Sequence, residues 1–511
     1  MTKMEIHSVA DLESLEERIR TAIGKHRLEE VLLGIQRAPP EVPPFVRAGL
    51  ALFAARFCSA GHRLPRQAEV GWPHLARIAD MVTEYQLADP LTFDQETWKT
   101  YLRSNPVFAF LRMSAGQMPY NISLYGRFGQ PLMLFDAIPK RLAQRTGPGR
   151  FDFATSFQRT CGLPLIDFLT VGFVALAAAH QHGAFTRADF DSARTRGLGL
   201  PSDDGVLLAL DHLAADPQGL ARQYHHFRNS DRRFAMYDLN PLLTYPIIRP
   251  WRQRGHLPAE TDRMIAPIPN LIAFRISMGI FYQMYNKFGP KFSDYFGDMF
   301  SAYVGFLLEN SVPPSALLSE DAIRSTYHPN DGKVPDWVVL DGNTAVLVEC
   351  KSTRFSRNAL STGDEAAVND SLKQVLKGLR QLHEFRTNCI ERRPGLEAIG
   401  HCTCYVPILV TLEPLYLVNS PMFHQYIDGL LADNGITGLP WQILSIDQLE
   451  TLQPHLHAGS GFSATLRELS QEPFADVLVR VSRDTGLTYR DSCLYDKDRE
   501  LYQKLGLVHP D

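Results

Sequence analysis

The 511-residue chain lacks several features that would place it in a specialised class of protein. Its net charge is −4, so no overall positive charge indicates nucleic-acid binding, although a local basic patch can still provide it. Its seven cysteines are scattered and odd in number, which favours reduced thiols over a disulfide framework. The first residues contain no apolar signal core. We therefore expect a cytoplasmic protein.

Long apolar runs and nucleotide-binding loops are also missing. The most apolar run, residues 163–179, is interrupted by Pro164 and Asp167, so it predicts a buried helix and no membrane span. No glycine-rich loop of the Walker A type is present. We therefore expect no ATPase in this chain and no association with a membrane.

The composition is that of a soluble protein, with 45% hydrophobic and 21% charged residues, and the length suggests two to four domains. Residues 1–225 show helical periodicity and little strand-like alternation, so they predict a mainly α-helical recognition or regulatory region. Residues 226–268 predict an Arg/Pro-rich connector, residues 269–455 an α/β domain, and residues 456–511 a C-terminal extension. The expected fold class is α+β multidomain.

Two short apolar runs, residues 337–340 and 345–348, predict a β-hairpin, because the Asp-Gly-Asn cluster between them is a strong turn signal. A two-residue turn places Asp336 opposite Glu349, whereas a three-residue loop would shift the pairing by about one position. Glu349 and Lys351 share a face because side chains alternate along a strand. Two carboxylates and one ammonium group then gather at one end of the hairpin.

Such a cluster suits a hard divalent cation. Two close carboxylates repel each other, and Mg²⁺ is typically held by one or two carboxylates together with water and phosphate oxygens. A bound metal lowers the pKa of its water and stabilises charge that develops on phosphorus. Lys351, two residues beyond Glu349, can orient the attacking water. The alternative interpretation is an exposed hairpin end with ordinary surface charges.

Pro335-Asp336 and Glu349-Cys350-Lys351 resemble the two halves of the motif of the PD-(D/E)xK nuclease superfamily. The resemblance covers less than half of the chain. It implies a restriction-endonuclease-like core, a mixed central sheet flanked by helices, that cuts phosphodiester bonds with Mg²⁺, for which Mn²⁺ is expected to substitute. It also implies that Asp336, Glu349 and the backbone carbonyl of Cys350 bind the metal, and that Lys351 serves the nucleophile.

The resemblance extends to positions on two neighbouring helices. Many nucleases of this superfamily carry a metal-binding glutamate on the helix before the hairpin, but Ser301 stands at the matching position, and Asp298 or Glu309 could replace it. Residues 366–386 predict an amphipathic helix. Gln374 best matches the glutamine or lysine that related nucleases place near the metal, and a solvated helix face is the alternative.

Positive charge is concentrated in two places. Residues 351–393 contain nine lysines and arginines against five acidic residues, a local cationic patch beside the motif. The connector is also rich in arginine, with a solvated or interdomain face as the alternative to phosphate contact. Both suit a polyanionic substrate. Together with Arg222 just before the connector, the arginines of residues 222–254 are Arg222, Arg228, Arg232, Arg233, Arg249, Arg252 and Arg254.

The order of elements predicted for the third region is that of an α/β core. It comprises helix 292–309, strand 322–327, the hairpin, helix 366–386, strand 405–412, helix 422–431 and strand 441–446.

The main hypothesis is a Mg²⁺-dependent endonuclease that hydrolyses phosphodiester bonds of DNA. A nuclease core joined to a large accessory region resembles prokaryotic anti-phage defence and restriction effectors of the Mrr-like and Shedu-like groups. Its partner would be nucleic acid, with a separate ATPase or further copies of this chain as possible protein partners. Two alternatives stay open: a non-catalytic helical scaffold that retains a nuclease fold for binding, and an RNA-cleaving or DNA-repair nuclease.

Overall fold

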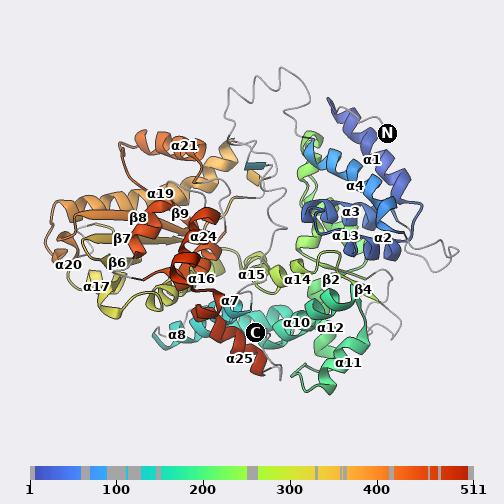
Figure 1. Ribbon diagram of the computed structural model, residues 1–511, viewed down its shortest axis with the longest axis horizontal. Helices are drawn as coiled ribbons and strands as arrows, with labels where there is room; N and C mark the ends of the chain where they lie inside the picture. The colour runs from blue at the N-terminus through green and yellow to red at the C-terminus, as the bar shows by residue number, and fades with distance from the viewer. Residues whose placement is uncertain are drawn as a thin grey trace.

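The structure is a computed structural model. It describes residues 6–58, 70–88, 107, 111–112, 128–145, 151–249, 263–328, 332–356, 359–360, 365–413, 419–457, 461–469 and 474–504. Within these ranges helices predominate, together with one sheet of four short strands and one sheet of five strands (Figure 1). The expected α+β class is confirmed.

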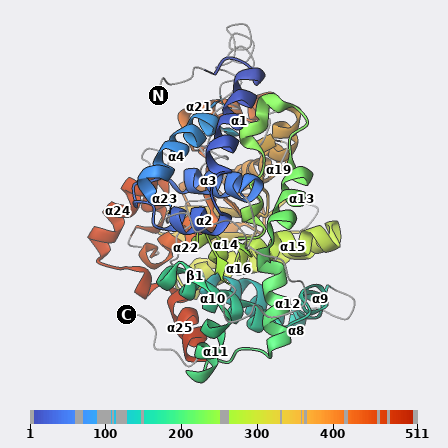
Figure 2. The same ribbon diagram turned by 90° about the vertical axis from the view of Figure 1, so that its right-hand side faces the viewer.

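Four N-terminal helices pack around one hydrophobic core. In the first of them, Ser8 caps the helix by accepting a hydrogen bond from the Asp11 N–H at 3.2 Å. Leu12, Leu15 and Ile19 then follow at helical spacing and are buried. Figure 2 shows these helices stacked above α10 and α12. The four are α1 (Val9–Ile23), α2 (Leu28–Gln36), α3 (Pro44–Phe57) and α4 (Trp72–Leu87).

A second helical group is centred on α10 (Leu165–His182), and its apolar sequence is the run predicted to be a buried helix. Among the described residues, α10 alone is long and apolar enough to cross a membrane by length and composition. It packs instead against α9, α12 and α14 in the protein core, so the prediction of a buried helix is confirmed. The group comprises α7 (Gly129–Leu132), η3 (Met133–Ala137), α8 (Ile138–Arg145), α9 (Phe153–Cys161), α10, α11 (Arg187–Thr195) and α12 (Asp203–Leu213).

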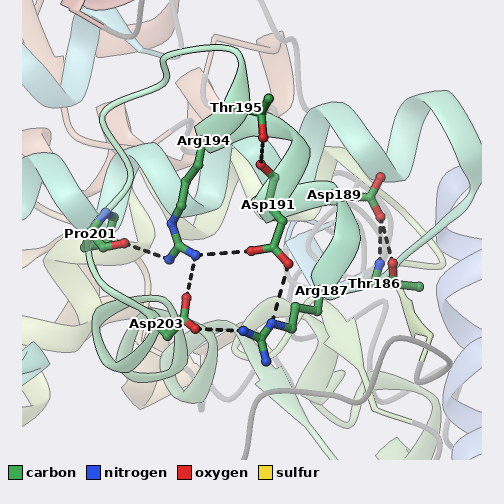
Figure 3. A network of polar contacts seen from close by, with 8 residues as sticks. All are labelled: Thr186, Arg187, Asp189, Asp191, Arg194, Thr195, Pro201 and Asp203. Atoms are coloured by element: carbon green, nitrogen blue, oxygen red, sulfur yellow. Dashed lines mark hydrogen bonds and ion pairs between the residues drawn. The ribbon is translucent and has the colours of Figure 1, made fainter.

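Ion pairs join α11 to α12 (Figure 3). Thr186 and Asp189 form a capping box at the start of α11. Arg187 and Arg194 of α11 both reach Asp203 at the start of α12, and the Arg187 contact measures 2.9 Å. These side chains are partly exposed, so each pair contributes only about 0–1 kcal/mol.

The connector is partly helical and partly extended. It contains η4 (Arg232–Tyr237), η5 (Pro241–Leu243) and β3 (Ile247–Ile248). The strand β3 joins β1 (Ala184–Phe185), β2 (Ala214–Ala215) and β4 (Met264–Ile265) in a sheet of order β1-β4-β3-β2, which ties the connector to the helical region. The helices that flank it are α13 (Pro217–Phe227), α14 (Asn270–Arg275) and α15 (Gly279–Phe288).

The five-stranded sheet has the order β5-β6-β7-β8-β9. The β5–β6 and β6–β7 pairs are antiparallel, and the β7–β8 and β8–β9 pairs are parallel, so the sheet is mixed. Asp341 pairs with Thr344, and Trp337 pairs with Val348, which confirms the two-residue turn. The strands are β5 (Leu317–Ser319), β6 (Trp337–Asp341), β7 (Thr344–Lys351), β8 (Cys404–Thr411) and β9 (Gln442–Ser445).

Helices cover both faces of this sheet (Figure 1). Alternation along the strands sends Val339 and Val346 into the core with α16 (Pro290–Glu309) and α22 (Ile446–Leu452). It sends Val338 and Leu347 into the core with α19 (Glu365–Ile390) and α21 (Pro421–Ala432). The remaining elements are η6 (Pro314–Ala316), α17 (Glu320–Arg324), α20 (Glu397–Gly400), η8 (Gln453–His455), α23 (Phe462–Glu468), α24 (Phe474–Thr485), η9 (Tyr489–Asp491) and α25 (Cys493–Lys504).

The prediction of a strand at residues 322–327 is wrong. The strand preceding the hairpin is β5, and α17 follows it directly. The Ser319 side chain accepts a hydrogen bond from the Ala322 N–H at 3.2 Å, and two acidic residues lie in the first turn. This N-terminal cap favours a helix over a strand at that point. The predicted helices 292–309, 366–386 and 422–431 and strands 405–412 and 441–446 are present as α16, α19, α21, β8 and β9.

Gly305 of α16 allows the indole of Trp337 to lie against the helix. A Cβ atom at position 305 would stand 2.1 Å from Cζ2 of Trp337. We expect Gly305→Ala to lower the free energy of unfolding by about 1–3 kcal/mol, because the ring must shift. Urea unfolding measures this change.

Gly297→Ala in the same helix is the matched control, since a Cβ there meets nothing within 4 Å. We expect it to be neutral or to stabilise the protein by up to about 1 kcal/mol. Equal losses of stability in the two variants would contradict the packing account.

Candidate active site

The end of the β6–β7 hairpin brings Asp336, Glu349 and Lys351 together. Asp336 lies just before β6 and accepts two hydrogen bonds. Its Oδ2 accepts from the Cys350 backbone N–H at 2.7 Å, and its Oδ1 accepts from the Ser301 hydroxyl at 2.8 Å. The hairpin register and α16 therefore both hold this carboxylate.

Glu349 is 2% exposed and is held from two sides. Its Oε1 forms an ion pair with the Lys351 ammonium group. Its Oε2 accepts a hydrogen bond from the Gln381 amide of α19 at 2.7 Å. The same Gln381 nitrogen donates to the Val334 carbonyl at 2.6 Å, which links the helix to the chain entering β6.

The pKa values of the two carboxyl groups are both raised. The pKa of Glu349 is raised to about 8, first by burial and then by the charge of Asp336, while Lys351 opposes both effects. Burial also raises the pKa of Asp336, although the hydrogen bonds from Cys350 and Ser301 act against it. Burial holds the pKa of the Cys350 thiol well above its usual range, so this sulfur is a poor nucleophile.

Gln381 takes the position near Glu349 for which the sequence favours Gln374. A Cβ atom at Gly378 would lie 3.4 Å from Cε of Lys351 and 3.5 Å from Cγ of Glu349, so α19 crosses the hairpin at this glycine. Gln381 follows Gly378 by one turn and reaches Glu349, whereas Gln374 precedes it by one turn and is exposed. The glycine in an otherwise regular helix is the sequence signal for this crossing point.

Ser301, at the position where the superfamily has a glutamate, contacts the site through Asp336. Glu309 lies two turns further along α16, is exposed and is 3.9 Å from Arg141, so it is not a third carboxylate of the site. Asp298 is exposed one turn before Ser301. Across the described ranges, no three His, Cys, Asp or Glu side chains are close enough to hold a metal together.

A nearby carboxylate that the sequence analysis missed is Glu320. Its backbone N–H donates to the Asp336 carbonyl at 2.9 Å. Burial and then the charge of Asp336 raise the pKa of Glu320, and its side chain lies 3.5 Å from Arg324. No motif spacing marks this residue, because its position depends on the pairing of β5 with β6.

Several arginines of the two predicted cationic surfaces form cation–π contacts or ion pairs within the protein. Arg354 lies over the rings of Phe281, Tyr282 and Tyr285 at 4.5, 5.2 and 4.5 Å. In the connector, Arg232 pairs with the buried Asp238 at 3.0 Å. Arg233 pairs with Asp231, and Arg249 pairs with Asp211. Arg252 and Arg254, and Arg357 of the other patch, lie outside the described residues.

The donor set fits Mg²⁺ or Mn²⁺. The carboxylates of Asp336 and Glu349 and the carbonyl of Cys350 are hard oxygen donors, and each carboxylate oxygen keeps a lone pair beyond the hydrogen bond it accepts. Mg²⁺ usually keeps several waters, so two protein carboxylates suffice. A cation between them would also relieve the repulsion that raises the pKa of Glu349.

No family profile matches this chain, and searches of curated proteins and of solved structures give no significant match.

The raised pKa of Glu349 predicts a pH dependence of stability in metal-free protein. The ordinary value is 4.5 and the folded value is about 8, so folding favours the protonated form. The unfolded chain ionises first as pH rises, and the contribution of Glu349 to stability therefore falls between pH 4.5 and 8. We expect Glu349→Gln to melt increasingly above wild type from pH 5 to pH 8 in EDTA.

Differential scanning calorimetry of both proteins measures this effect, and the difference between them removes contributions from other groups. Excess Mn²⁺ should reduce the difference. A constant difference across this pH range would show that Glu349 is ionised in the metal-free protein.

Proposed function

We propose that the protein is a Mg²⁺-dependent nuclease that hydrolyses phosphodiester bonds at Asp336, Glu349 and Lys351. The observation that carries the proposal is the position of a buried carboxylate, Glu349, beside a half-buried one, Asp336, with a single ammonium group between them and solvent. Burying charge without full compensation is unfavourable, and such clusters concentrate at functional sites. A purely structural ion pair would match one carboxylate with one cation.

The arrangement of the surrounding elements supports the same proposal. The mixed sheet has helices on both faces, and the hairpin carries the three residues at one end. This is the architecture expected for a restriction-endonuclease-like core. A metal at this end would be reached past β7 and α19, where Lys351 is 19% exposed.

Each residue has a distinct part in the proposed reaction. Asp336 and Glu349 hold the cation, and Ser301 and Gln381 fix their orientation by the hydrogen bonds described above. Lys351 neutralises part of the negative charge of Glu349, and its ammonium group can orient a water for attack on phosphorus. When bound, Mg²⁺ would supply positive charge for the transition state and lower the pKa of that water.

The proposed substrate is DNA. Lys373, Lys377 and Arg380 are exposed at positions i, i+4 and i+7 of α19, so they lie along one side of the helix that crosses the hairpin. Such a row of cations suits a phosphate backbone. The preference for DNA over RNA, and for a role as a prokaryotic defence or restriction effector, rests on the likeness of a nuclease core joined to a large accessory region to such effectors.

Plasmid cleavage in Mg²⁺ tests the catalytic assignment. We expect wild-type protein to nick or linearise the plasmid, and Asp336→Asn and Lys351→Ala to lose at least about a hundredfold in rate. Lys140→Ala, which removes an exposed cation of α8 that pairs with Asp136, is the control and should cleave nearly as fast as wild type.

Equal cleavage by wild type, Asp336→Asn and Lys351→Ala would overturn the assignment. RNA of the same length, offered in parallel, distinguishes an RNA-cleaving enzyme from a DNA-cleaving one.

A second comparison separates the two glutamines of α19. Gln381→Ala removes the hydrogen bond to Glu349, and we expect a loss of about 10–100-fold in rate or metal affinity. Gln374→Ala alters an exposed side chain and should change the rate little. Cleavage assays at several Mn²⁺ concentrations measure the rate and the metal affinity. A larger loss in Gln374→Ala than in Gln381→Ala would favour Gln374 as the glutamine that acts at the site.

A further inference from the structure

Two histidines of the N-terminal helical group direct their ring nitrogens toward each other. His26 lies in the short loop between α1 and α2, and His74 lies in the first turn of α4. Their Nε2 atoms are 3.0 Å apart. Both α1 and α2 pack against α4, as Figure 2 shows. The histidine pair therefore links the α1–α2 loop to the start of α4.

The two rings are tilted away from the geometry of a straight hydrogen bond. Their centroids are 4.8 Å apart and their planes cross at 75°. A ring nitrogen lies about 1.15 Å from its ring centre, so a straight N–H···N bond of the same length would separate the centres by about 5.3 Å. The observed separation is shorter, so the line from each ring centre through Nε2 departs from the line that joins the two nitrogens.

The tilt directs both nitrogens toward a point outside the pair. If the two ring axes lie in one plane and share the tilt equally, they meet about 2 Å from each Nε2 at an angle of about 100°. Zn²⁺ binds imidazole nitrogen at about 2.0–2.1 Å with tetrahedral angles. Two tetrahedral nitrogen ligands stand about 3.3 Å apart, so the rings need to separate by only a few tenths of an ångström.

The surroundings of the pair allow an ion to reach it and to bind. His74 is exposed and His26 is partly buried, so the contact lies at the surface. Burial and then the charge of His74 lower the pKa of His26, Glu30 acts in the opposite direction, and Lys25 lowers the pKa further. A neutral imidazole offers a lone pair to a metal, whereas a protonated one offers none.

We propose that His26 and His74 together bind one Zn²⁺ ion, or a related transition-metal ion, through their Nε2 atoms. Within the described ranges no third His, Cys, Asp or Glu side chain completes the site, so its other positions are open to water or to a ligand from solution. The ion would hold the α1–α2 loop against α4. The proposal is independent of the nuclease proposal, because the pair contains no residue of the carboxylate site and Mg²⁺ prefers oxygen ligands.

Isothermal titration calorimetry of the full chain with Zn²⁺ tests the proposal. A large excess of Mg²⁺ is present throughout, so that sites made of oxygen ligands hold Mg²⁺. We expect one saturable Zn²⁺ site per chain in wild type, and His26→Ala and His74→Ala should each weaken it about tenfold or more, because each removes one of two ligands.

Two controls locate the ion. His180→Ala removes an exposed histidine near the end of α10 and should bind Zn²⁺ like wild type. Asp336→Asn alters the carboxylate site and should also bind like wild type. No saturable Zn²⁺ binding by wild type, a loss in fewer than both pair variants, or an equal loss in either control would overturn the proposal.

Hydrogen exchange measured by mass spectrometry provides an independent readout of where the ion binds. Zn²⁺ should slow exchange in wild-type peptides that cover residues 24–28 and 72–76, because the ion joins these two segments. His74→Ala should show no such change. Protection confined to β7 and α19 would place Zn²⁺ at the carboxylate site and contradict the assignment to the histidine pair.

Discussion

The placement of the half-buried Asp336 beside the buried Glu349 is the constraint on which the surrounding structure depends. Two carboxylates repel each other in a poorly solvated site, so their positions must be imposed by neighbouring elements. The hairpin turn fixes the register that places one opposite the other. Ser301 of α16 and Gln381 of α19 then hold one carboxylate each, from opposite faces of the sheet.

Two glycines bring these helices close enough. Gly305 lets α16 approach the indole of Trp337, whose N–H donates to the Ser301 carbonyl at 3.1 Å. Gly378 lets α19 approach Lys351 and Glu349. Each helix therefore contacts the sheet close to its residue that donates to a carboxylate, Ser301 in α16 and Gln381 in α19.

The helical part of the chain is joined to this site through α15. Gln283 of α15 donates to the Cys161 sulfur at 2.9 Å and lies 3.2 Å from His212, in the second helical group. On the other side, the rings of Phe281 and Tyr285 enclose Arg354, three residues after Lys351. One hydrophobic core also continues from α7–α12 into α16 and one face of the sheet. The segment after Lys351 is thus anchored to helices far away in sequence.

Local patterns made the hairpin predictable. Turn chemistry and two-residue alternation both act over short distances, so the register and the grouping of Asp336, Glu349 and Lys351 could be inferred from the sequence. The contact of Gln381 was missed, because helical periodicity alone does not tell which polar residue of α19 lies over the hairpin, and Gly378 is the one local sign of the crossing point. Glu320 was missed because its position depends on β5 (Leu317–Ser319), and the sequence predicted that strand at residues 322–327.

Calorimetric titration with Mn²⁺ in buffers of different ionisation enthalpy tests the central claim most directly. If Asp336 and Glu349 share one cation, Mn²⁺ should bind near pH 7 and release close to one proton, since the pKa of Glu349 is about 8 in the metal-free protein. Asp336→Asn should abolish this binding, and Glu349→Gln should abolish the proton release. Binding of Mn²⁺ that is unchanged in both variants, or no binding by wild type, would contradict the account.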